Sequence, residues 1–107
     1  MALTSKLAQR NPAAATLEDA YTVPASTKFE GRVLVANRSA SATAFRISLA
    51  LAGAADDPMQ YIAYDVAITG NDTAWTERFA IPAACVVRVY ATLATLSFAI
   101  TGLESPA

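Results

Sequence analysis

The sequence contains no histidine among its 107 residues. This absence excludes Ser-His-Asp and Cys-His catalytic arrangements and any histidine-ligated metal site. The two lysines, Lys6 and Lys28, lie in an N-terminal arm and a loop, so a Ser-Lys mechanism has no support. The four glycines are dispersed, at positions 31, 53, 70 and 102, and form no glycine-rich phosphate loop. We therefore expect a protein that is not an enzyme, with no catalytic residue and no cofactor.

Cysteine and acidic clusters are equally scarce. Cys85 is the single cysteine and lies in the apolar run 83–87, which excludes an internal disulfide and favours a buried structural thiol over a reactive one. The pairs Asp56-Asp57 and Asn71-Asp72 supply oxygen atoms, but a calcium ion needs six or more converging ligands. Turn residues are the simpler interpretation of both pairs, and no metal site is predicted.

Charge is also low. Charged residues make up 16% of the chain and the net charge is −1, against a typical charged share of about 25%. No basic stripe exists, so nucleic-acid binding is disfavoured. The low charge indicates either a subunit whose surface is partly covered in an assembly or simply an alanine-rich composition. No run of about 18 apolar residues and no signal-peptide pattern is found, so we expect no membrane partner and synthesis in the cytosol.

The clearest structural pattern is the alternation of apolar and polar residues from Arg32 to Leu51. Phe45, Ile47, Leu49 and Leu51 alternate with small or polar residues, as expected for a half-buried strand. Val33 and Val35 share one face of the preceding run, and Asn-Arg-Ser-Ala-Ser separates the two runs. The pattern predicts a β-hairpin.

Similar short runs follow along the chain. They place Ile62, Tyr64, Val66 and Ile68 on a core face, and they end with a last predicted hairpin over residues 85–103, with Val87, Val89, Leu96, Phe98 and Ile100 pointing inward. Seven strands divided by turns, without a long helix, predict an all-β fold. The expected architecture is an antiparallel two-sheet β-sandwich, jelly-roll or immunoglobulin-like, with an open barrel as the next alternative.

The first residues differ from this body. Residues 1–17 show no sustained period, and Pro12 would interrupt a helix there. We expect an extended N-terminal arm over residues 1–17, ordered only against a neighbour or not at all, and a β-sandwich domain over residues 18–107. Within the arm, Leu7, Arg10, Pro12 and Leu17 are the predicted docking residues.

Three aromatic residues suggest an alternative function, the binding of a glycan. Tyr61, Trp75 and Tyr90 could lie on an outward face and stack against sugar rings, which would make the protein a glycan-binding or receptor-binding module for host attachment. The competing interpretation places Trp75 in the core beside Phe79, with the tyrosines supporting cross-strand neighbours. The competing interpretation is favoured from the sequence.

The order of several short motifs resembles small structural proteins of tailed-bacteriophage virions. The motifs are Tyr-Thr-Val-Pro-Ala at 21–25, Val-Ala-Asn-Arg at 35–38 leading to Phe45-Arg46, Tyr-x-Ala-Tyr-Asp at 61–65, Asn-Asp-Thr at 71–73, and Val-Tyr-Ala-Thr at 89–92 followed by Leu-Ser-Phe at 96–98. The resemblance implies a non-enzymatic, multi-copy decoration, neck or tail accessory subunit. Its partners would be itself, as a homo-oligomer, or a major capsid, neck or tail protein, and its location would be the virion.

Overall fold

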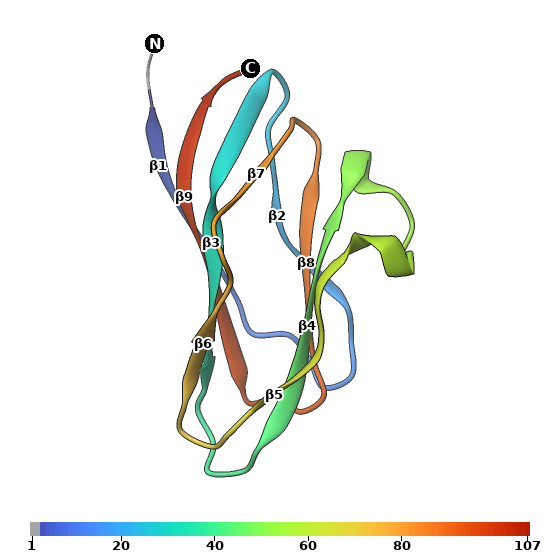
Figure 1. Ribbon diagram of the computed structural model, residues 1–107, viewed down its shortest axis with the longest axis vertical. Helices are drawn as coiled ribbons and strands as arrows, with labels where there is room; N and C mark the ends of the chain where they lie inside the picture. Colours follow the sequence, from blue (N-terminus) through green and yellow to red (C-terminus); the bar gives the residue numbers. More distant parts are fainter. Residues whose placement is uncertain (1–2) are drawn as a thin grey trace.

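The computed structural model describes residues 3–107 and shows two antiparallel β-sheets packed face to face (Figure 1). The predicted all-β sandwich is confirmed, with nine strands rather than seven. The elements are β1 (Thr4–Arg10), β2 (Glu18–Thr22), β3 (Thr27–Asn37), β4 (Thr43–Ala50), η1 (Leu51–Gly53), η2 (Pro58–Gln60), β5 (Tyr61–Ile68), β6 (Thr73–Trp75), β7 (Phe79–Ile81), β8 (Val86–Ala91) and β9 (Leu96–Pro106). Over residues 3–107, no helix is long and apolar enough to cross a membrane.

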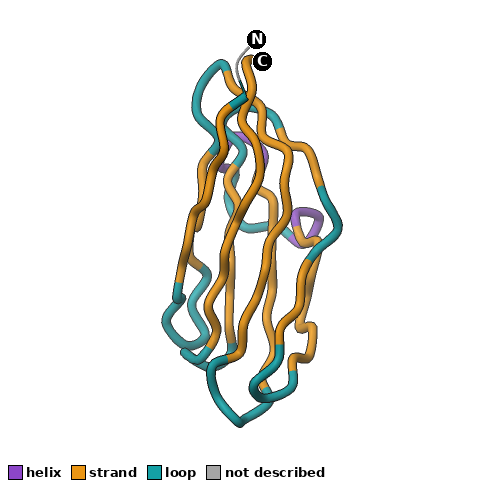
Figure 2. Tube along the Cα trace, turned by 90° about the vertical axis from the view of Figure 1, so that its left-hand side faces the viewer, coloured by secondary structure: helices purple, strands orange, loops and turns teal. Residues whose placement is uncertain are grey.

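The strands divide between the sheets in an order that differs from the chain order. The first sheet has the order β1-β9-β3-β6, with β7 also paired to β3, and the second has the order β2-β8-β4-β5. Figure 2 looks onto the first sheet, in which β3 and β9 are the longest strands. β3 and β9 form its centre, because all eleven residues of β3 pair in register with β9.

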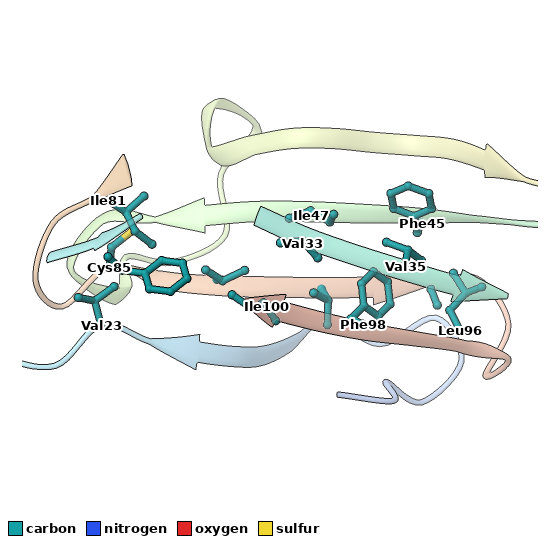
Figure 3. Close-up of a cluster of buried hydrophobic side chains, with 14 of the residues drawn as sticks. Val23, Val33, Val35, Phe45, Ile47, Ile81, Cys85, Leu96, Phe98 and Ile100 are labelled. Atoms are coloured by element: carbon teal, nitrogen blue, oxygen red, sulfur yellow. The ribbon is translucent and has the colours of Figure 1, made fainter. Parts of the chain in front are cut away.

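The core fills the space between the two sheets (Figure 3). It is built from alternate residues of the central strands, and the predicted inward positions of β3, β8 and β9 are confirmed as fully buried. Phe45 and Phe98 meet edge to face with ring centroids 6.2 Å apart. Cys85 is 3% exposed, and burial raises the pKa of its thiol. The sequence-based interpretation of Cys85 as a buried structural thiol is therefore confirmed.

The predicted hairpins are wrong. β3 and β4 belong to different sheets, as do β8 and β9, so each connection crosses the sandwich instead of turning back along the same sheet. Asn37 fixes the connection that follows β3: its side chain is 3% exposed and donates from Nδ2 to the carbonyl oxygens of Ser41 and Thr69 at 2.9 and 3.1 Å. Turn-forming residues look the same in both kinds of connection, which is why the sequence pattern did not distinguish them.

The expected core face of β5 is also wrong in part. Ile68 is buried, but Ile62, Tyr64 and Val66 are 46%, 58% and 40% exposed. The register between β4 and β5 shifts twice, and Asp65 has a φ of 50°. This bulge breaks the strict alternation on which the prediction was based.

The N-terminal segment is part of the sandwich. All seven residues of β1 pair in register with β9, from Thr4 opposite Glu104 to Arg10 opposite Phe98. Residues 3–17 therefore do not form a separate arm that needs a neighbour to become ordered, whereas Met1 and Ala2 of the predicted arm lie outside the described residues. The expectation was wrong because the inward residues of β1 are charged or small, namely Lys6, Ala8 and Arg10. The sequence therefore shows no alternation of large apolar residues that would indicate a strand.

A hydrogen bond joins the two sheets near the termini. The Tyr21 hydroxyl on β2 donates to the Glu104 carboxylate on β9, and Lys6 Nζ lies 3.9 Å from the same carboxylate. Burial, followed by the hydrogen bond to Glu104, raises the pKa of Tyr21 above its ordinary value of 10.0.

This raised pKa predicts a loss of stability at alkaline pH. Above pH 10 the unfolded chain ionises Tyr21 while the folded chain holds it neutral, so the free energy of unfolding should fall as pH rises from there. Tyr21→Phe keeps the ring, which packs 4.8 Å from Phe29, and should weaken this pH dependence. Urea unfolding between pH 8 and pH 11 measures the effect. Identical pH profiles for wild type and variant would contradict it.

Candidate functional site

Large apolar side chains gather on the outer face of the first sheet, away from the core. Leu34 on β3 lies opposite Trp75 on β6 and opposite Ala99 on β9. Leu7 on β1 and Leu103 on β9 share this face further along. The exposed fractions are 61% for Leu3, 63% for Leu7, 39% for Leu34, 63% for Trp75 and 38% for Leu103. We call these five residues the outer stripe.

β1 carries its charged side chains on the inward side and its leucines on the outward side, which is the reverse of an ordinary half-buried strand. Ala8 packs against the core, so Lys6 and Arg10 share its inward side, while Leu3 and Leu7 point outward. Arg10 Nε lies 2.8 Å from Glu18 Oε1 on β2. The backbone N–H of Ala13 and then Arg10 bind the Glu18 carboxylate and lower its pKa. The charged residues of β1 thus have ion-pair partners within the chain, whereas its leucines face solvent.

A groove lies at the end of the outer stripe formed by Leu34 and Trp75. It has a volume of about 560 Å³, and its walls include Trp75, Leu34 and the polar side chains of Gln9, Asn11 and Ser97. Arg32 stands on the same face, opposite Thr101. Over residues 3–107 Arg32 has no ion pair and no side-chain hydrogen bond. The face therefore combines apolar contacts with charged side chains, among them Arg32 and Lys28, which have no ion pair within residues 3–107.

The second sheet carries a cluster of three tyrosines around one arginine on its outer face. The Arg46 guanidinium carbon lies 4.2 Å from the centroid of the Tyr64 ring and 4.5 Å from that of Tyr90. Arg46 Nε and Nη2 donate to the Asp65 carboxylate at 2.7 and 3.3 Å, and these hydrogen bonds raise the pKa of Arg46. One face of each of the Tyr64 and Tyr90 rings is therefore covered by the protein's own cation.

Tyr61 completes this cluster at its rim. Its ring meets that of Tyr64 edge to face at 5.1 Å, and its hydroxyl donates to Asp56 Oδ1 at 2.8 Å. Burial, and then the Asp56 hydrogen bond, raise the pKa of Tyr61. A pocket of about 410 Å³ lies beside Arg46, Tyr61 and Tyr64, with Asp56 and Pro58 closing it.

The structure does not bring the three predicted glycan-contact residues together. Tyr61 and Tyr90 lie on the outer face of the second sheet, but Trp75 lies on the outer face of the first, across the core. They cannot line one sugar site. The alternative placement of Trp75 in the core is also wrong, because its side chain is 63% exposed. A break between β6 and β7, where Thr76 pairs with Val33, turns Trp75 outward.

The four predicted docking residues have different surroundings. Leu7 belongs to the outer stripe, Arg10 pairs with Glu18, Pro12 is fully buried and Leu17 is half-buried. Of these, only Leu7 presents an apolar surface to a partner. Leu34 and Leu103 were not among the residues predicted to dock. Leu34 carries a usable signal, since a leucine between the inward Val33 and Val35 must face outward on a strand.

Within residues 3–107, no three Cys, Asp or Glu side chains lie close enough to hold a metal ion. Comparisons with known protein families, with curated proteins and with solved structures find no match.

Proposed function

We propose that the protein is a non-enzymatic structural subunit that docks in a multi-copy assembly through the outer stripe. The observation that carries the proposal is that every strand along the order of the first sheet places a large apolar side chain on its solvent face, where Leu7 and Trp75 are each 63% exposed. Several exposed large apolar side chains on one face of a small domain support an interaction surface there. Burying one such side chain contributes about 1.5–3 kcal/mol.

The size of the face supports docking to another protein. The molecule measures 44 Å along the strands and 20 Å across the sheet (Figure 2). A stable interface covers about 800 Å² on each partner, which such a face can provide. The unpaired Arg32 favours a partner surface that is apolar and carries an acidic group, since a buried charge needs a partner.

The assembly we propose is a tailed-phage virion, with attachment to further copies of this chain or to a major capsid, neck or tail protein. The support is the order of sequence motifs described above, together with the low charge of the chain. A subunit whose outer face is covered needs fewer charged residues for solubility than a free monomer does.

The outer stripe predicts the outcome of an incorporation experiment. The double variant Leu34→Ser with Trp75→Ser should fold normally but enter particles at a level about tenfold lower, because two exposed apolar contacts are lost. The matched control is Leu51→Ser with Met59→Ser, which removes residues that are 65% and 86% exposed elsewhere on the surface. Quantitative mass spectrometry of particles from a phage that encodes the chain gives the copy number. Equal incorporation of both variants would overturn the proposal.

A second candidate is recognition of a glycan at Trp75 alone. The observation that favours it is the exposed indole beside the side chains of Gln9, Asn11 and Ser97, an arrangement that suits an apolar sugar face with a polar edge. It predicts saturable sugar binding that quenches or shifts the fluorescence of Trp75 and is lost in Trp75→Ala. Because the indole is exposed, Trp75→Ala should change stability by less than about 1 kcal/mol. The absence of a response to a sugar panel would eliminate this candidate.

A further inference from the structure

The four edges of the sandwich differ in how they are protected against pairing with another strand. β5 is bulged at Asp65, and the register of β2 shifts between Asp19 and Tyr21. The fourth edge is split into β6 and β7, each of three residues, with Thr76 turned back onto Val33. Short, bulged and interrupted edges resist the addition of a further strand.

β1 is neither bulged, interrupted nor as short as β6 and β7. Its seven residues pair with β9 without a register shift, and none has a positive φ. Its other side has no partner strand among residues 3–107, so its free backbone groups can receive another strand. Figure 1 shows β1 at the margin of its sheet.

We propose that a second copy of this chain adds its own β1 to this edge, antiparallel and related by a two-fold axis. Such an axis stands perpendicular to the sheet, so the two outer faces lie on the same side. The register that pairs all seven residues is centred on Leu7, which places Leu7 opposite Leu7 of the second copy. The proposal specifies the partner of the proposed structural subunit and rests on that function only for its role in assembly.

This register is compatible with the side chains of β1. On the outer face it pairs Leu7 with its equivalent and Ser5 with Gln9 of the second copy. On the inner side it places Lys6 opposite Ala8 and Arg10 opposite Thr4, so no two like charges stand directly opposite each other. Directly opposed apolar residues stabilise a strand pair, and opposed like charges would destabilise it. The two outer stripes then form one surface across the dimer.

Disulfide trapping tests both the pairing and its register. Leu7→Cys should give a disulfide-linked dimer on air oxidation, seen by non-reducing electrophoresis. A mixture of Ser5→Cys and Gln9→Cys should cross-link, while each of these variants alone should not, because its cysteines would lie four residues apart along the strands. Wild type, with Cys85 buried, and Leu51→Cys, at an equally exposed position, are the controls. A Leu7→Cys yield no higher than that of Leu51→Cys would overturn the proposal.

A charge substitution provides the complementary test without a cross-link. Leu7→Lys puts two like charges opposite each other in the dimer but leaves the monomer unstrained, since Leu7 is 63% exposed. Light scattering at several concentrations should show a dimer dissociation constant raised about tenfold, whereas Leu51→Lys should leave it unchanged. A monomeric wild type at all concentrations would also contradict the pairing. That result would leave the expected loss of particle entry in the Leu34 and Trp75 double variant unaffected. Each of the two proposals can therefore be contradicted without the other.

Discussion

Replacing Gly102 by alanine is expected to cost about 3 kcal/mol or more of the free energy of unfolding. Gly102 on β9 pairs directly with Gly31 on β3. A Cβ on Gly102 would lie 2.1 Å from the Glu30 carbonyl oxygen and 2.6 Å from the Gly31 Cα. Both are backbone atoms of the central strand pair, so the clash can be relieved only by separating β3 from β9.

Gly53→Ala is the matched control for this experiment. An added Cβ there would meet only the Val86 side chain, at 3.6 Å, although the φ of +68° carries a strain of roughly 1 kcal/mol. Urea unfolding of the two variants should separate them clearly. If Gly102→Ala were no more destabilising than Gly53→Ala, the close approach of β3 and β9 would be wrong.

The second large effect is expected at Phe98, which should lose about 3–5 kcal/mol when truncated to alanine. Its side chain is 1% exposed and lies between the sheets against Phe45. Because the two rings come from different sheets, the cavity left by the truncation would weaken the packing of the sheets against each other.

Leu103→Ala tests the same strand on its opposite face. Leu103 belongs to β9 and is 38% exposed on the outer stripe, so its truncation should cost less than about 1 kcal/mol. A comparable loss at Leu103 and Phe98 would mean that the outer stripe is structural rather than available to a partner. Thermal unfolding by circular dichroism is sufficient for this comparison.

The sequence predicted the sandwich because strict alternation in β3, β8 and β9 reports which side of a strand is buried. It did not predict which strands pair. Gly31 and Gly102 lie 71 positions apart, and nothing local marks them as neighbours. The turns after β3 and β8 have the composition of hairpin turns, yet both cross to the other sheet, since turn residues do not record the direction in which the chain continues.

The candidate site was predicted only in part, for a related reason. Leu7 was identified for the wrong structural reason, as part of a separate arm, because β1 carries its apolar residues on the outward side. Trp75 was placed in the core by extending one alternating run from Trp75 to Ile81, and the break at Thr76 shifts the pattern. Irregularities of one or two residues thus decide which face is available for binding.

The most direct test of the account is oxidative footprinting of Trp75 in the free protein and in the assembled particle. Met59 is the internal control, because it is 86% exposed and lies away from the outer stripe, on η2. In the free protein both side chains should be oxidised readily. In particles the account predicts strong protection of Trp75 with Met59 still reactive. Trp75 oxidised as fast in particles as in the free protein would contradict docking through the outer stripe.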